Sequence, residues 1–115
     1  MTEEAGAGPV EVFRVGLEQR ESRDALVLAG QINMDAAARL REEALFAVAR
    51  GRPVDIDWRE AQYLSASAIQ VLLALGQALQ AGGRTLAVAA DNPAIRGTLE
   101  MAGLVRQFPL REAKE

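Results

Sequence analysis

The chain has 115 residues, half of them apolar and a quarter charged, with a formal net charge of −3, which fits one globular domain with a single modest core. It contains no cysteine and no histidine, so disulfides, thiolate chemistry, the common zinc sites and histidine acid–base catalysis are excluded. The negative charge gives no reason to expect nucleic acid as a partner, and no apolar run reaches the roughly 18 residues that predict membrane insertion. A cytoplasmic protein without a cofactor is the expectation by default.

The N-terminal part predicts a loose segment and then two strands. Residues 1–9 are rich in glycine, alanine and glutamate, and we expect them to be flexible. The stretch VEVFRVGLEQ, residues 10–19, alternates as a strand does, and ALVLAG, residues 25–30, is a short apolar run typical of a buried strand. The polar turn ESRD between them favours an antiparallel pair.

The next stretch, AAARLREEALFAVARG, predicts a helix that begins at Asp35. Aspartate is a favoured N-cap, and Gly51 lies where a left-handed residue commonly ends a helix. The apolar side chains of one face are Leu40, Ala44, Ala47 and Val48.

The middle of the chain predicts a strand, a helix and a strand. PVDIDW, residues 53–58, is the third strand, and REAQYL is expected to be a connection. A second helix is expected over residues 67–81, ending at a pair of glycines, and RTLAVAA, residues 84–90, is the fourth strand.

The C-terminal part predicts a third helix and an edge strand. Asp91 or Asn92 is expected to cap the helix, with Pro93 in its first turn and Gly103 at its end. VRQFPL is expected to add a short edge strand before the polar tail REAKE. Because strands and helices alternate after the first strand, we expect an α/β fold with a mainly parallel sheet.

The second helix is apolar over more of its surface than one layer of packing requires. One face is Ile69, Leu72, Leu73, Gly76 and Leu79. An adjacent face is Ala68, Val71, Leu75 and Ala78. This second face either packs under a neighbouring helix or forms a surface for a partner, and the sequence leaves both alternatives open.

Two hydroxyl groups, Ser65 and Ser67, precede or begin this helix. Either could be its N-cap, because a serine oxygen accepts a bond from a free backbone N–H at a helix start. A phosphate at the same place would be tolerated by the helix dipole and would add about two negative charges beside an apolar face. Nucleophilic catalysis is disfavoured because no histidine is present to act as a base.

Four stretches in this order resemble the STAS domain, the family of sulfate-transporter tails and anti-sigma-factor antagonists. They are LVLAGQIN, VDIDWREAQYLSASAIQVLLAL, AGGRTLAVAADNP and IRGTLEMAGLVRQF. The resemblance implies a four- to five-stranded mixed sheet with three to four helices packed mainly on one face. It places the domain at residues 10–110, after the flexible segment 1–9 and before the tail 111–115.

The resemblance also implies a binding site at the start of the second helix, where antagonists of this family are phosphorylated. Ala66 stands at the usual acceptor position and Ser65 at the usual acidic position, so Ser67 and then Ser65 are the candidate phosphorylation sites. The implied partner-binding residues are Asn33, Asp35, Asp57, Ser65, Ala66, Ser67, Ala68, Gln70 and Val71.

The resemblance therefore implies a non-enzymatic module of a bacterial-type signalling system, a monomer or weak dimer that regulates a protein partner by partner switching. That partner is expected to be an anti-sigma kinase or a chemosensory histidine kinase. The alternative is an accessory subunit of a transporter ATPase of the lipid-trafficking type. A third class, nucleotide or lipid binding, is disfavoured because the glycine turn AGGR lacks the lysine and hydroxyl of a phosphate-binding loop.

Overall fold

Four strands form one mixed sheet in the computed structural model, which describes residues 13–111. They are β2 (Phe13–Gln19), β3 (Asp24–Ile32), β4 (Val54–Leu64) and β5 (Leu86–Ala90), and they lie side by side in that order. β2 is antiparallel to β3, whereas β3, β4 and β5 are parallel to one another. The predicted α/β class and the antiparallel first pair are confirmed.

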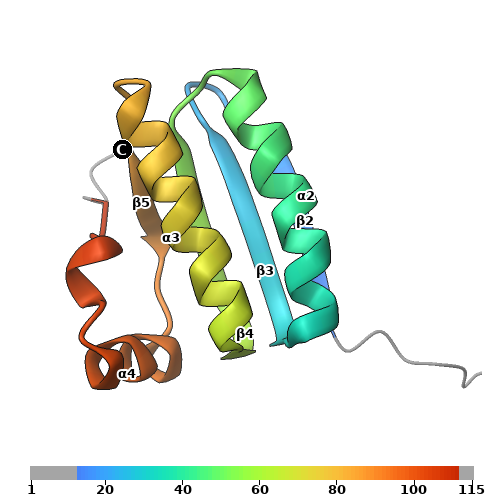
Figure 1. Ribbon diagram of the computed structural model, residues 1–115, viewed down its shortest axis with the longest axis vertical. Coiled ribbons are helices and arrows are strands. Elements are labelled where there is room, and N and C mark those ends of the chain that lie inside the picture. Colours follow the sequence, from blue (N-terminus) through green and yellow to red (C-terminus); the bar gives the residue numbers. More distant parts are fainter. Residues whose placement is uncertain (1–12, 112–115) are drawn as a thin grey trace, which may run out of the picture.

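Two long helices cover one face of this sheet. α2 (Met34–Arg50) and α3 (Ala66–Ala81) run side by side, α2 in front of β2 and β3 and α3 in front of β4 and β5 (Figure 1). The shorter α4 (Pro93–Ala102) lies beyond the end of β5, and the single-turn 3-10 helix η1 (Val105–Gln107) leads the chain back toward that strand (Figure 1). Right-handed crossovers through helices are the usual way to connect parallel strands.

The core lies between the sheet and the two long helices. Leu26, Leu28, Ile56, Leu40 and Leu72 are all at most 1% exposed, and full burial of such a side chain stabilises the fold by about 1.5–3 kcal/mol. A second contact closes the β5 side, where the rings of Trp58 and Phe108 lie 5.7 Å apart and tilted by 56°. The C-terminal part of the chain is thereby anchored to the middle of β4.

Helix ends follow the sequence with one correction. Asn33, not Asp35, is the N-cap of α2: its side-chain oxygen accepts the Ala36 N–H at 3.0 Å, while Asp35 lies within the first turn of the helix. An uncharged amide makes this bond as well as a carboxylate does. Gly51, with φ of +78°, ends α2 as predicted.

Two predicted boundaries on the sheet are wrong. REAQYL is not a connection but the second half of β4, which continues past two register shifts relative to β3. VRQFPL is not a strand: it contributes η1 and then a single bridge between Leu110 and Val88. Pro109 has no N–H for a longer ladder. The structure describes residues 13–111 only. The predictions for residues 1–9, for the first residues of the first strand and for the end of the tail lie outside that range.

Candidate functional site

The three helices all begin at the carboxyl ends of the parallel strands, each with an uncharged cap. Asn33, Ser65 and Asn92 accept backbone N–H bonds from the first turns of α2, α3 and α4. The starts of α2 and α3 are also joined directly, because the Ser65 N–H donates to the carbonyl of Ile32 at 2.8 Å. The turns around residues 33 and 65 therefore lie next to each other.

The two serines have different environments. Ser65 is 7% exposed, and its Oγ accepts the Ala68 N–H at 3.1 Å, so it is the cap of α3. Ser67, in the first turn, is half-buried and makes no hydrogen bond through its side chain with the residues described. Ala66, at the position usual for a phosphate acceptor, is exposed and has no hydroxyl. Ser67 is thus the hydroxyl open to solvent.

A groove of about 680 Å³ runs between α2 and α3, and Ser67 lies on its lining. Its walls are apolar except for Gln70, Ser67 and one charged side chain, Arg41, among the residues that the structure describes. The other lining residues are Met34, Ala37, Ala38, Ala44, Leu45, Val48, Val71, Ala74, Leu75 and Ala78. We call this the α2–α3 groove.

The sequence left open whether the second apolar face of α3 packs under a neighbouring helix or forms a surface for a partner, and the structure shows part of each. Ala68 and Leu75 are at most 2% exposed and belong to the core, packed under α2. Val71 is only half-buried, and Ala74 and Ala78 are exposed on the walls of the groove. The face therefore both packs and presents apolar surface.

Most of the predicted site residues come together at this end of the molecule. Asn33, Asp35 and residues 65–71 occupy the adjoining first turns of α2 and α3. Ala68 is fully buried, so it supports the turn from inside. Asp57 is elsewhere: it lies in the middle of β4 and bonds to the Arg59 guanidinium at 2.9 Å, and this bond raises the pKa of Arg59.

The sequence reading missed the contribution of α2 to the groove. Met34 is 73% exposed and Leu45 is 58% exposed, and both line it. A signal was present: Met34, Ala38, Leu45 and Val48 recur at intervals of three, four and seven residues, which is a second apolar line beside the buried one. The buried face alone was enough to predict α2 as a helix, so the sequence did not call for a second apolar line on it.

Asn92 and Asp91 fix α4 near the same end. The Asn92 amide donates to the carbonyls of Trp58, Arg59 and Ala61, which holds the irregular part of β4. Burial raises the pKa of the Asp91 carboxyl, but the bonds from Arg96 and from Trp58 Nε1 outweigh it, so that the pKa is lowered. Asp91 is therefore a charged, structural partner of the core tryptophan.

Residues 13–111 contain neither a cluster of metal-binding side chains nor a membrane-spanning helix. No group of three or more acidic side chains gathers in this part of the chain. No helix there is both long and apolar enough to span a membrane. The arrangement at the starts of α2 and α3 offers caps, a hydroxyl open to solvent and exposed apolar surface.

Solved structures with the same fold include anti-sigma-factor antagonists. An antagonist from Mycobacterium paratuberculosis superposes with a TM-score of 0.76 at 24% identity, over 89% of this chain and 87% of that one. SpoIIAA superposes in its unphosphorylated form with a TM-score of 0.73, at 15% identity and over 88% and 90% of the two chains. The phosphorylated form of SpoIIAA from Bacillus, also 15% identical, superposes with a TM-score of 0.68 over 88% of this chain and 94% of that one. At these identities the likeness shows the fold.

The sequence itself identifies the family. No curated protein matches the chain. A family model described as "Mlab, STAS domain" matches residues 15–112, which is most of the chain. The alternation of strands and helices, the capped start of α3 and this match agree with one another. The chain belongs to the STAS domain family.

Proposed function

We propose that this chain is a protein-interaction module that binds a kinase-type signalling partner through the starts of α2 and α3 and through the α2–α3 groove. STAS domains of the antagonist type are generally non-enzymatic, and their name implies protein partners. The observation that carries the proposal is the groove: apolar side chains of both helices lie exposed beside the free hydroxyl of Ser67. Exposed apolar surface of this extent is typical of a docking site.

Phosphorylation of Ser67 would act as an off-switch in this proposal. Ser67 lies in the first turn of α3, which contains no acidic side chain, so the helix dipole favours a phosphate there. The same phosphate would stand on the lining of the groove and bring about two negative charges to an apolar contact. Ser65 is the poorer acceptor, because its hydroxyl is buried and occupied as a cap.

A second candidate is an accessory subunit of a transporter ATPase, which would use the same groove without a switch. Ala66 favours it, since the position at which the family resemblance expects an acceptor has no hydroxyl. The two candidates differ in the companion protein and in the response to charge at Ser67, but not in the surface.

The test is affinity purification of the tagged chain from its own cells, with companions quantified by mass spectrometry. The bait is compared with Val71→Arg, which puts a charge into the groove, and with Met101→Arg, which puts the same charge on a residue of α4 that is 92% exposed. A kinase lost with Val71→Arg and kept with Met101→Arg supports the proposal, and a permease–ATPase pair with that pattern supports the second candidate. A companion that both variants retain contradicts the groove as the site.

The switch is tested on the purified companion with Ser67→Asp, Ser67→Ala and the control Ser22→Asp, which places the same charge on an exposed turn. We expect binding to fall about tenfold or more for Ser67→Asp only, which corresponds to about 1.4 kcal/mol. Equal binding by all four proteins would contradict the switch and leave the contact surface intact.

A further inference from the structure

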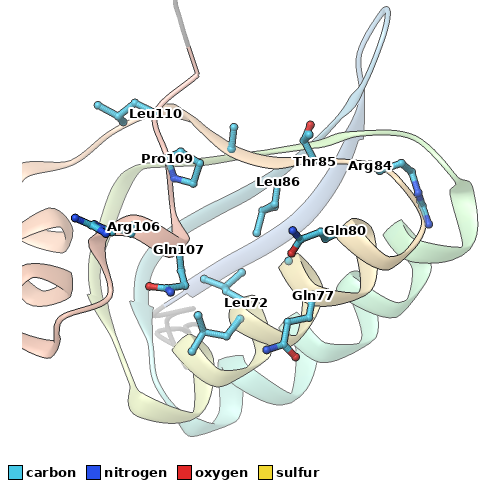
Figure 2. A pocket seen from close by; sticks show the side chains of 13 residues that line it. Leu72, Gln77, Gln80, Arg84, Thr85, Leu86, Arg106, Gln107, Pro109 and Leu110 are labelled. Atoms are coloured by element: carbon cyan, nitrogen blue, oxygen red, sulfur yellow. The ribbon is translucent and has the colours of Figure 1, made fainter.

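A second groove, of about 570 Å³, lies on the other side of α3. It is lined by one side of α3, by the start of β5, by η1 and by the C-terminal segment after η1. Figure 2 shows Leu72 and Leu86 facing one another across its floor, with the amides of Gln107 and Gln80 on opposite sides. We call it the β5 groove. It shares no lining residue with the α2–α3 groove, and the inference below does not rest on the proposed function.

The backbone of β5 is open along this groove. The Val54 N–H donates to the carbonyl of Thr85 at 3.1 Å, so the backbone groups of Thr85 face β4 and those of Leu86, one residue on, face the opposite edge. Two residues further along the same edge, Val88 receives a bond from Arg111 and donates one to the carbonyl of Pro109. Leu86 has no such partner among the residues described.

Pro109 is the reason that the pairing stops. Continued by one step, the parallel register would bring the N–H of residue 109 to the carbonyl of Leu86, and proline has none. The chain before it turns away instead, because Phe108 is buried against Trp58 and its carbonyl accepts a bond from Arg96. The edge of β5 beside Leu86 therefore ends in the groove and not under the protein's own chain, as far as the structure describes it.

The side chains around this edge suit an extended peptide. Gln77, Gln80 and Gln107 each offer an amide, which can both donate to and accept from peptide groups. Gly76 lets α3 approach the strand closely, since a Cβ there would lie 3.3 Å from Leu86 Cδ2. The floor of Leu72 and Leu86 would receive an apolar side chain.

The charged side chains that line the β5 groove indicate that a peptide bound there would be acidic. The two charged residues lining the groove in the described range are both arginines, Arg84 and Arg106, at its opposite ends (Figure 2). Arg84 donates to the carbonyl of Val48, whereas Arg106 makes no ion pair or hydrogen bond with residues 13–111. No acidic side chain of the described residues lines the groove to balance them.

We propose that the β5 groove binds an extended acidic segment of a partner protein, which adds to the edge of β5 at Leu86. The backbone of the segment pairs with Leu86, its apolar side chains alternate onto Leu72 and Leu86, and its carboxylates lie near Arg106 and Arg84. This is strand addition to an exposed sheet edge, in which the main chain supplies affinity and alternate side chains supply selectivity. The segment would lie on the side of α3 away from the α2–α3 groove, so its binding does not depend on a partner there.

The experiment is an NMR titration of the full ¹⁵N-labelled chain with two blocked hexapeptides, acetyl-EVEVEV-amide and acetyl-KVKVKV-amide. We expect the acidic peptide to shift the amides of Leu86 and of its neighbours in the groove, to slow hydrogen exchange at the Leu86 N–H, and to bind several times more tightly than the basic peptide. An acidic peptide N-methylated on its pairing face keeps the charges, but it loses the donors for the Leu86 carbonyl and places methyl groups against the strand. It should therefore bind weakly and fail to protect the Leu86 N–H.

Charge reversal provides the matched control. Arg106→Glu should remove the preference for the acidic peptide, whereas Arg39→Glu, on the exposed surface of α2 and outside both grooves, should not. The inference is overturned if Leu86 is unaffected, if the N-methylated peptide protects it equally, or if the shifts appear around Ser67 instead. Shifts at Leu86 that depend on protein concentration without any peptide would also overturn it, since a second copy of the chain would then be the occupant.

Discussion

The two ends of the parallel sheet are held by different chemistry. At the amino end, the Asp24 carboxylate is fully buried and receives bonds from Arg50 at 2.6 and 3.2 Å and from Arg52 at 2.9 Å. Asp55, 3% exposed, is likewise bonded to Arg23 and Arg111. At the carboxyl end, three uncharged caps begin the three helices. The amino end is fixed by buried ion pairs, whereas the helices at the carboxyl end begin with amide and hydroxyl caps and have one half-buried ion pair, between Asp91 and Arg96.

This difference between the two ends of the sheet assigns stability mainly to the amino end and the proposed binding to the carboxyl end. A buried carboxylate that is bonded to two guanidinium groups cannot lose them without leaving an unpaired charge, so the amino end is rigid. A serine or asparagine cap satisfies its helix and leaves no charge to neutralise, so the surface around it stays open to a partner. The proposed contact site lies at the starts of α2 and α3, which begin with uncharged caps, away from the buried ion pairs of the amino end.

The largest expected effect comes from breaking the amino end. Asp24→Ala leaves Arg50 and Arg52 without their shared partner and should lower the free energy of unfolding by about 3 kcal/mol. Urea denaturation followed by the fluorescence of the single tryptophan, Trp58, measures it. The control is Glu18→Ala, which removes an exposed pair with Arg20 and should cost less than about 1 kcal/mol. Equal losses in the two variants would contradict the contrast.

A smaller effect is expected where α4 meets β4. Asp91→Asn keeps an acceptor for Trp58 but loses the charge that pairs with Arg96, which should cost about 1 kcal/mol at neutral pH. The pKa of Asp91 is lowered in the folded state, so its stabilising contribution is present above the ordinary carboxyl pKa and is lost as the pH falls through the folded value. Unfolding curves of wild type and variant should therefore converge as the pH falls below about 4, and a constant difference down to pH 2 would contradict this.

The smallest effects are expected at the carboxyl end, and they separate the two serines. Ser65→Ala removes the cap of α3 and should destabilise the protein by about 1 kcal/mol. Ser67→Ala removes a hydroxyl that no described residue needs, and should change stability by less than about 0.5 kcal/mol. Thermal unfolding of both variants measures these two changes in stability. A larger loss of stability for Ser67→Ala than for Ser65→Ala would mean that Ser67 has a structural role.

Much of the fold and part of the candidate site could be predicted from the sequence alone. The helix ends at Gly51, Asn92 and Gly103 follow from local backbone chemistry, which acts over a few residues. The second half of β4 could not be predicted, because its exposure pattern is set by two register shifts against β3. Neither could the share of the groove that comes from Met34 and Leu45, since it depends on which line of α2 faces α3.

The sequence by itself determined the order of the elements, the family and the turn that carries Ser65 and Ser67, because periodicity and capping are properties of neighbouring residues. Only the tertiary structure decided which serine is the cap, that Asp57 lies away from the site, and that β5 keeps an open edge beside Leu86. The cap lies where β4 ends beside β3, since the Ser65 N–H donates to the carbonyl of Ile32, and the open edge lies where Pro109 meets β5. Both depend on segments far apart in the chain. Their distances are set by packing, which no local pattern of residues contains.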